Sequence, residues 1–575
     1  MTYDLRREKW IPWRRRSGVV EWGDPTALVS QMAGPDSDPV TAIAAPRPDF
    51  NGALQEFLIG LLTVALQPLD EQAWRDGWVS PPSVADFRAA LDALPGAFDL
   101  DGEGPRFLQD LTVSDFASID AKGIDQLLID SPGDQGIKFN KDLFVKRNRV
   151  NQLGRPAAAM ALLTMQTYAP AGGQGHRTSM RGGGPLTTLV DPRSVSRGGQ
   201  HASTEGLWYK LWANVETRDQ WLERSLSDLP LNTAFPWLAP TRQSLKDRAT
   251  TLMDGHPLQS YFGFPRRIRL EFSGAGNCDL SDMEDSHVVT SFRMVNYGVK
   301  YEGWNHPLSP HYRQKVNDTE WLPVHGQPSG VSWRDWLSLS FMANSAENLR
   351  RPAQVVSHFS SWRARSVGQK QFNIHVLGYD MDNMKARGWV DTVVPGYRIE
   401  NPQVARDIYA AAYSLVEATS LAASALLGNI KDALFRISDA ATGDLDQVKM
   451  ELWASTEVEF YKRIEHIVSV TLEDSDGGGK LLSRINEGRV EFASVLEQHA
   501  LAIFDRWCSP SGLDVDALRR RVKARYQLTS TVRGYSKLGK KLFSALQIPF
   551  PDSNSASRGA KSEKTGKATA NKRGK

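Results

Sequence analysis

The sequence predicts an α+β fold, with a large mixed N-terminal domain followed by a C-terminal four-helix bundle. The chain has 575 residues, which is too long for one ordinary hydrophobic core, so a large domain with at least one smaller one is expected. The first 400 residues mix short apolar runs with frequent Gly, Pro and Asp, whereas the later part has long helical periodicity and little glycine. These observations predict a mixed domain over 1–400, a bundle over 401–548 and a disordered basic tail over 549–575.

The N-terminal part contains recognisable strands and helices. The run from Trp10 to Trp22 alternates in the manner of a strand, a turn and a second strand. Apolar residues fall at helical spacing between Leu54 and Ala65, which predicts a buried helix. A further helix is expected over 155–168, because Pro156 suits a first helical turn and the segment ends just before a glycine-rich stretch.

Four later segments carry helical periodicity and are joined by short polar links, which favours an antiparallel bundle. They are approximately Pro402 to Arg436, Asp444 to Val470, Gly488 to Trp507 and Asp514 to Leu546. The last 24 residues hold seven Lys or Arg against two acidic residues and have almost nothing to bury. Because the whole chain is only +3, the part before this tail is net negative, and any basic patch in it must be local.

Cysteine content and hydropathy indicate a cytoplasmic protein. Cys278 and Cys508 cannot make a disulfide framework or a four-cysteine zinc site, and the first residues lack the apolar stretch of a signal peptide. The most apolar segment, Phe57 to Leu66, is too short to span a membrane. A membrane location is therefore excluded at this stage.

The stretch from Tyr168 to Val190 holds six glycines. It lacks the Gly-Lys-Ser/Thr of a P-loop, since Gly175 is followed by His176, and it lacks a dinucleotide fingerprint because it follows a helix. What remains is bare backbone that can approach a partner closely, with Arg177 and Arg181 available for phosphate. The alternative is a solvent loop without a function.

Two clusters of cations suggest nucleic acid as a partner. In the first cluster the cations alternate with aromatic residues, a combination that suits a nucleic-acid backbone and a stacked base. Its members are Lys138, Phe139, Lys141, Phe144, Lys146, Arg147 and Arg149. A solvated loop with two buried phenylalanines would give the same pattern.

The second cluster lies in the last helical segment. From Arg519 to Lys541 there are nine Lys or Arg and no acidic residue, and one-sided charge of this length favours an anionic partner over a merely solvated face. The candidate contacts are Arg519, Arg520, Arg521, Lys523 and Arg525.

Evidence for catalysis is poor. The acidic run from Asp279 to Asp285 could bind a metal in principle, but it lacks EF-hand spacing and is more typical of an exposed acidic loop. The motifs G-x-S-x-G and H-E-x-x-H are absent from the sequence.

Several landmarks in the same order resemble the CasA family, the large subunit of the type I-E CRISPR surveillance complex known as Cascade. The resemblance spans nearly everything from Met1 to about Pro549. The landmarks are WIP with basic residues at 10–16, MRGGGPLTTLV at 180–190, PRRIRL at 265–270, GAGNCDLSD at 274–282, LGYDMDNMKARGW at 377–389 and the helical bundle.

The resemblance implies a subunit that is not itself a nuclease. Members of the family recognise the protospacer-adjacent motif on double-stranded DNA, help to start unwinding, and present the target to a separate helicase-nuclease, while a guide RNA supplies the remaining specificity. The implied partners are therefore target DNA, guide RNA, the other Cascade subunits and the helicase-nuclease. No cofactor is expected, and no structural zinc either, because the family's CxxC pattern is broken: Ser281 stands where the second cysteine would follow Cys278.

The resemblance also implies a minor-groove reading site made of a glycine loop, a lysine finger and a glutamine wedge. The glycine loop corresponds to Ala171 to Gly175, which includes Gly172, Gly173 and Gln174. The lysine finger falls on Asn277, and the wedge falls on Ser357 and His358, so both depart from the family pattern. The segment from Phe139 to Arg149 matches one that contacts DNA in the family.

The leading hypothesis is therefore a non-catalytic DNA-recognition subunit. Two alternatives remain open: a divergent metal-dependent nuclease that uses the acidic run at 279–285, and a helical scaffold that contacts only other proteins.

Overall fold

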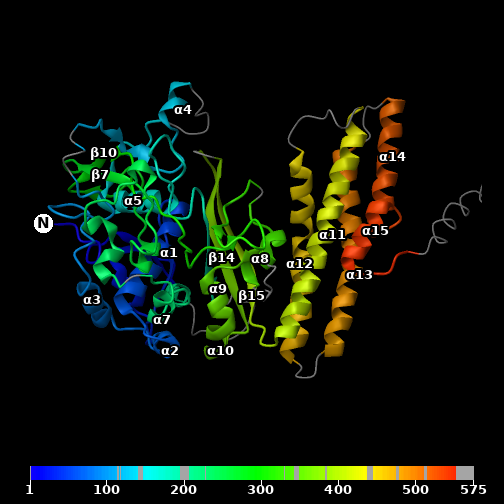
Figure 1. The fold of residues 1–575 in the computed structure, drawn as a ribbon, viewed down its shortest axis with the longest axis horizontal. Coiled ribbons are helices and arrows are strands. Elements are labelled where there is room, and N and C mark those ends of the chain that lie inside the picture. The colour runs from blue at the N-terminus through cyan, green and yellow to red at the C-terminus, as the bar shows by residue number, and fades with distance from the viewer. Residues whose placement is uncertain are drawn as a thin grey trace, which may run out of the picture. The chain divides into compact units, whose positions relative to one another are not determined.

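The computed structural model describes two compact units. The described residues are 2–112, 116, 118–139, 147–193, 206–226, 228–328, 330–341, 349–382, 385–436, 445–473, 478–509 and 514–551. The first unit runs to Val331 and resumes over Ser338–Arg398, while the second combines Ser332–Leu337 with the chain from Ile399 onward. Helices and strands are mixed in the first unit and the second is helical (Figure 1), which confirms the expected α+β class.

The first unit begins with a three-stranded antiparallel sheet in the order β2-β1-β3. Its strands are β1 (Ile11–Arg15), β2 (Val20–Gly23) and β3 (Val40–Ile43). The predicted strand-turn-strand is thereby confirmed. The predicted buried helix is α1 (Pro48–Leu66), and its Phe57 ring packs edge-on against Trp10 at 5.7 Å between centroids.

The second sheet lies beside α5 (Arg155–Tyr168), whose bounds agree with the sequence-based prediction. The central strand β10 (Val288–Val295) pairs antiparallel with three others, so the sheet branches. These are β4 (Lys122–Gly123), β5 (Leu153–Gly154) and β7 (Arg267–Phe272). A small hairpin of β8 (Gly276–Asn277) and β9 (Glu284–Asp285) follows β7.

The third sheet has the antiparallel order β15-β14-β6. It contains the long hairpin of β14 (Gln371–Asp382) and β15 (Lys385–Tyr397), together with β6 (Leu186–Asp191). Because β6 directly follows the glycine-rich stretch, this sheet holds one end of that stretch in place.

Shorter elements complete the first unit. A further sheet contains β11 (His311–Tyr312), β12 (Leu322–Pro323) and β13 (Arg350–Arg351). The remaining helices are α2 (Glu71–Val79), α3 (Val84–Asp92), α4 (Asp134–Lys138), α6 (Leu207–Trp212), α7 (Arg218–Leu222), α9 (Gln354–His358) and α10 (Ala364–Ser366). Helix α8 (Trp336–Ser340) begins within Ser332–Leu337, the segment assigned to the second unit.

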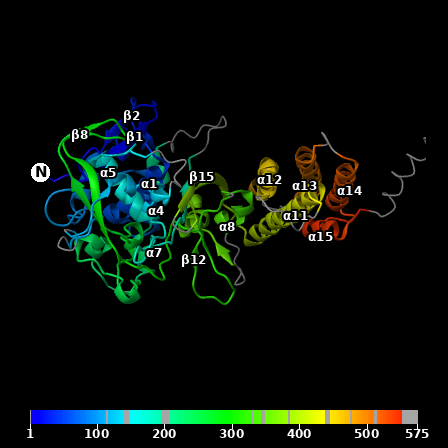
Figure 2. The ribbon, with the colours of Figure 1, turned by 90° about the horizontal axis from the view of Figure 1, so that it is seen from above.

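The helical unit contains four long helices and one short one among its described residues. They are α11 (Pro402–Leu434), α12 (Asp446–Glu473), α13 (Gly478–Trp507), α14 (Val515–Val532) and α15 (Lys537–Leu546). Helix α11 packs against the other four, which are seen from above in Figure 2. The fourth predicted segment is thus two helices, because the chain turns at Gly534, which has a φ of +81°.

Helix α11 is long and apolar enough to cross a membrane by length and composition alone. However, 56% of its most apolar window is buried within the protein, as in the core helix of a bundle.

Candidate nucleic-acid interface

The glycine loop, defined here as residues 169–185, joins the end of α5 to the start of β6. Its exposed part is Gly172, Gly173 and Gln174. Gly175 follows with a φ of +79°, and its carbonyl accepts a 2.8 Å hydrogen bond from the backbone N–H of Tyr297. The exposed tip is therefore anchored on the chain that follows β10.

A buried carboxylate holds both ends of this loop. Glu56 of α1 accepts hydrogen bonds of 2.6 Å from the Tyr168 hydroxyl before the loop and from the Thr187 hydroxyl after it. Its other oxygen pairs with the Arg181 guanidinium at 2.6 Å. Burial and the adjacent carboxylate raise the pKa of Tyr168 well above its usual value, so this hydroxyl stays a donor.

Arg181 was expected to contact phosphate, and its position in the structure contradicts that prediction. Its side chain is only 3% exposed and donates to Glu56, Thr187 and Ser309. Because a guanidinium with these partners has no free edge toward solvent, Arg181 supports the loop from below.

Arg177, three residues after the exposed tip, is half-buried. Its guanidinium donates to the side chain and the carbonyl of Ser244, and it pairs with the exposed Asp247 at 3.2 Å. Part of its charge is therefore already neutralised.

The end of the β14–β15 hairpin borders the glycine loop. Gly184 has a φ of +70°, and a Cβ placed there would lie 2.6 Å from the carbonyl oxygen of Tyr379 on β14. A Cβ at Gly183 would lie 3.8 Å from Sδ of Met381 on the same strand. Only glycine permits an approach as close as that at Gly184.

The predicted lysine-finger position does not lie beside the glycine loop. Asn277 lies in β8, next to Cys278, whose Cβ is 3.4 Å from the Cβ position of Gly154. Gly154 precedes the first residue of α5, whereas the glycine loop follows the last. A helix of 14 residues is roughly 21 Å long, so Asn277 and the loop are at opposite ends of α5.

The predicted wedge is also placed elsewhere. Ser357 and His358 lie at the end of α9, next to Phe359, whose ring packs against Trp78 of α2. Burial lowers the pKa of His358 below its usual value, and the nearby Arg363 acts in the same direction. Helix α9 itself packs against β6, the strand that follows the glycine loop.

Sequence reasoning missed the residues that do border the loop tip. Asn296 donates a 2.8 Å hydrogen bond from its amide to the Gln174 carbonyl. Arg266 lies under Gly172, with Nη1 at 3.4 Å from the Cβ position of that glycine. Arg266 lies within the PRRIRL landmark at 265–270, but nothing in that motif indicates a contact with the glycine loop, and Asn296 belongs to none of the motifs named above.

The cluster near α4 is partly described. Phe139 is 59% exposed, and the Lys138 ammonium lies 5.8 Å from the centre of its ring. Arg147 donates a 3.0 Å hydrogen bond to the carbonyl of Ile137, and both Arg147 and Arg149 line a pocket of about 590 Å³. The predicted contacts Lys141, Phe144 and Lys146 lie outside the described residues.

The basic segment of the helical unit is less one-sided in space than in sequence. Arg525 pairs with Asp505 of α13 at 2.7 Å, and Arg521 donates to the carbonyls of Cys508 and Ser509 at the end of that helix. Arg519, whose side chain is 78% exposed, lies 3.8 Å from Asp516. Lys523 is exposed, and Arg520 is half-buried with no partner for Nε among the described residues.

The acidic run at 279–285 is used for local structure. Asp279 accepts backbone N–H groups from Asn151 and Gln152 at 2.6 and 3.0 Å, and Asp285 pairs with Arg155 at 2.8 Å. Within the described part of the chain, no group of three or more His, Cys, Asp or Glu is placed to hold a metal ion. The nuclease alternative therefore gains no support from this region.

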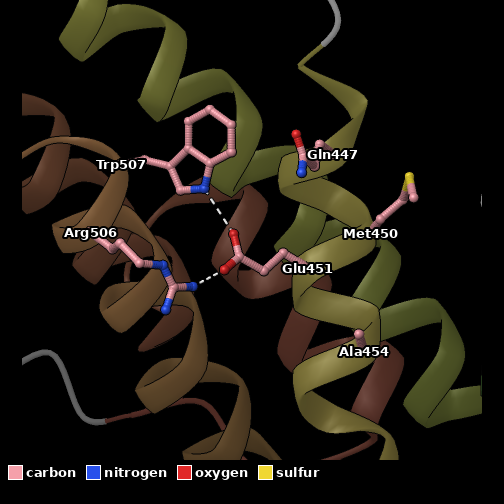
Figure 3. Close-up of a pocket in the computed structure, with 6 residues that line it drawn as sticks. All are labelled: Gln447, Met450, Glu451, Ala454, Arg506 and Trp507. Carbon is pink, nitrogen blue, oxygen red and sulfur yellow. Dashed lines mark hydrogen bonds and ion pairs between the residues drawn. The ribbon is translucent and has the colours of Figure 1, made fainter.

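A surface pocket of about 700 Å³ lies between α12 and the end of α13 (Figure 3). Glu451 of α12 accepts a 2.8 Å hydrogen bond from the Trp507 indole and pairs with Arg506. Because its one carboxylate already has two partners on α13, we interpret this contact as a tie between the two helices.

Taken together, these features define a two-unit protein whose mixed unit presents a glycine loop anchored at both flanks and whose second unit is a helical bundle. The sequence model of the family "CRISPR-associated protein Cse1" matches residues 4–487. The chain therefore belongs to the Cse1 family, which confirms the resemblance found in the sequence.

Solved structures of this family share the fold. CasA (Cse1) from Thermus thermophilus matches with a TM-score of 0.62 and 17% identity, covering 92% of this chain and 99% of its own. Cse1 from Thermobifida fusca matches with a TM-score of 0.64 and 15% identity, covering 95% and 98%. A chain of a structure described as a CRISPR RNA-guided surveillance complex matches with a TM-score of 0.58 and 14% identity, covering 92% and 99%.

Proposed function

We propose that this chain is the non-catalytic large subunit of an RNA-guided CRISPR surveillance complex. In this role it reads a short protospacer-adjacent motif in double-stranded DNA through the minor groove, helps to start unwinding, and recruits a helicase-nuclease. Family membership supports the assignment to such a complex, and one matching chain comes from a structure of that description.

The observation that carries the DNA-reading part is the exposed backbone from Gly172 to Gln174. It projects no side chain at two consecutive positions, and Glu56 fixes both flanks of the loop. A bare and rigid backbone can approach base edges in a narrow groove without first losing conformational entropy. Because the minor groove mainly separates A·T from G·C, we expect a short and relaxed motif.

The structure revises which residues would accompany the loop. Asn296 and the end of the β14–β15 hairpin are the better candidates, because they border the loop, whereas Asn277 lies at the other end of α5. We therefore include Asn296 and no longer include Asn277 among the groove contacts.

A binding assay with the assembled complex tests this proposal. Guide-matched duplexes with a randomised flanking motif would first identify the preferred motif. We then expect Gly173→Asp to reduce discrimination between preferred and mutated motifs at least tenfold, through bulk and repulsion of phosphate. The aspartate should fit, because the only atom of the described, non-adjacent residues within 4 Å of a Cβ at this position is Nδ1 of His176 at 3.8 Å.

The matched control is Gly96→Asp, at an exposed glycine with no atom within 4 Å of the added Cβ. This variant should discriminate between preferred and mutated motifs as well as the unmodified protein does. Unchanged discrimination in Gly173→Asp would refute the role of the glycine loop. Metal-dependent DNA cleavage by the purified chain, lost on Asp282→Ala, would instead favour the nuclease.

A second observation favours contact with other proteins, as a scaffold role would require. Helix α14 presents apolar side chains on one exposed stripe, at spacings of three and four residues. They are Val515, Leu518, Val522 and Tyr526, which are 66%, 47%, 63% and 75% exposed. Copurification of other subunits that is lost on Val522→Asp would support this role.

A further inference from the structure

Arg266 is a buried cation under the tip of the glycine loop. The residue is 5% exposed and immediately precedes β7. Its Nη2 donates a 2.6 Å hydrogen bond to the carbonyl of Pro170, which fixes the guanidinium against the first residues of the loop. Its Nε is buried and has no hydrogen-bond partner among the described residues.

No described carboxylate neutralises this charge. The next residue, Arg267, is buried as well, but it pairs with Asp110 at 2.6 Å. Arg266 has no ion pair of this kind, and burial lowers its pKa to about 10. Because burying a cation without a counter-charge is unfavourable, a site of this kind is suited to an anion that arrives from outside.

Gly172 leaves the guanidinium within reach of the surface. A Cβ at this position would lie 3.4 Å from Nη1 of Arg266 and 2.4 Å from Cβ of His176, so a side chain here would both clash and cover Nη1. Gly172 and its neighbour Gly173 are exposed. Because Gly172 has no side chain, it does not cover Nη1 of Arg266, beside which the His176 side chain also lies.

The surroundings add positive charge. Burial lowers the pKa of His176 in the same loop, and the charges of Arg266 and of Lys122 in β4 act in the same direction. An anion beside Gly172 would thus lie near a guanidinium that has no carboxylate partner among the described residues.

We propose that Arg266 and the bare backbone at Gly172 and Gly173 form a binding subsite for one DNA phosphate. The glycine loop would then serve two purposes: its tip meets the groove, and Arg266 beneath it anchors the strand independently of sequence. This inference rests on the proposed function, because it takes the ligand of the loop to be DNA.

Binding of random-sequence duplex DNA to the full-length chain, measured over a series of salt concentrations, tests the subsite. We expect Arg266→Gln to weaken binding roughly tenfold and to reduce the slope of log K against log salt by about 0.9, the amount for one phosphate contact in B-DNA. Arg266→Lys, which keeps the charge, should retain most of the slope. Arg75→Gln, which removes an exposed cation from α2, should change neither quantity.

Thermal unfolding separates this role from a purely structural one. The glutamine amide can still donate to the Pro170 carbonyl, and the substitution removes an uncompensated buried charge, so Tm should stay unchanged or rise. An unchanged salt slope in Arg266→Gln would overturn the proposal. A lower Tm with weaker binding but the original slope would also overturn it, since Arg266 would then act only through folding.

Failure of the phosphate subsite can be distinguished from failure of the proposed function. The phosphate subsite predicts an equal loss of affinity on every sequence, whereas the groove-reading role predicts lost discrimination in Gly173→Asp. Lost discrimination in Gly173→Asp together with an unchanged slope in Arg266→Gln would overturn the subsite alone.

Discussion

Arg177 and Arg181 are only four positions apart in the glycine loop, yet they have different environments. Arg181 is paired with Glu56, and the side chains of both residues are at most 5% exposed. Arg177 is paired with Asp247, which is 67% exposed. A buried pair that loses one partner leaves an uncompensated charge, whereas an exposed pair is screened by water.

We therefore expect Arg181→Ala to lower the free energy of unfolding of the first unit by about 3–5 kcal/mol, because Glu56 would remain buried without its cation. Arg177→Ala should cost only about 0–1 kcal/mol. Urea unfolding would measure the change in free energy of unfolding in both variants. Hydrogen exchange at the amides of 172–175 would measure local opening of the loop. An equal loss of unfolding free energy in the two variants would contradict the assignment of Arg181 as the anchor of the loop.

At the scale of elements, carboxylates of α13 neutralise part of the positive charge of α14. Arg525 and Arg533 are each 2.7 Å from a carboxylate of α13, Asp505 and Glu497 respectively. Arg519 and Lys523 have no such partner on α13 among the described residues. Of these four cations, the latter two therefore have more charge left for an external polyanion.

We expect the double variant Arg519→Ala/Lys523→Ala to weaken DNA binding equally on all sequences. If both residues contact phosphate, the slope of log K against log salt should fall by about 0.9 for each cation removed. The control is Arg525→Ala/Arg533→Ala, which removes two cations that already have carboxylate partners and should change the slope less. A larger fall of this slope in the control variant would refute the ranking of these residues.

At the scale of the whole molecule, the helical unit includes six residues from an earlier part of the chain, Ser332–Leu337. Trp333 is fully buried there, stacks on Phe460 with 4.3 Å between ring centres, and donates its indole N–H to the Trp453 carbonyl at 2.8 Å. The stability of the bundle thus depends on a residue that precedes its first helix by about seventy positions.

We expect Trp333→Ala to lower the free energy of opening of α12 by about 3–5 kcal/mol, the usual cost of removing a buried tryptophan. Native-state hydrogen exchange at the amides of α12 would measure it. Trp362→Ala is the matched control, because Trp362 is 72% exposed and should change stability little. Unchanged protection of α12 in Trp333→Ala would show that the insertion does not stabilise the bundle.

Several elements could be predicted because their signals are local. The amphipathic run of α1, the Pro156 start of α5 and the alternation in β1 and β2 each depend on neighbouring residues. The long helices were placed well, although α13 begins ten residues before the predicted Gly488 and the last segment breaks at Gly534. Glycine adopts a positive φ without strain, and whether it does so at Gly534 depends on how α14 and α15 pack. Periodicity alone could therefore not locate the break.

The sequence predicted the centre of the candidate site, the glycine loop, but not the residues that surround it. A run of glycines is itself a local signal, so the exposed tip at 172–174 followed from the sequence alone. The neighbours Asn296 and Arg266 are brought there by β10 and β7, and the burial of Arg181 depends on Glu56 of α1. Contacts between residues this far apart in the chain leave no pattern in a single sequence.

The sequence by itself thus determined the α+β class, the helical C-terminal unit, the glycine loop and the family. Local periodicity and ordered motifs are properties of the chain before it folds. Only the tertiary structure decided that Arg181 is an internal anchor, that Asn277 lies at the far end of α5, and that Arg266 has no counter-charge within the described part of the chain. Whether a cation is free or already paired depends on which distant residues share its surroundings, and folding alone sets those surroundings.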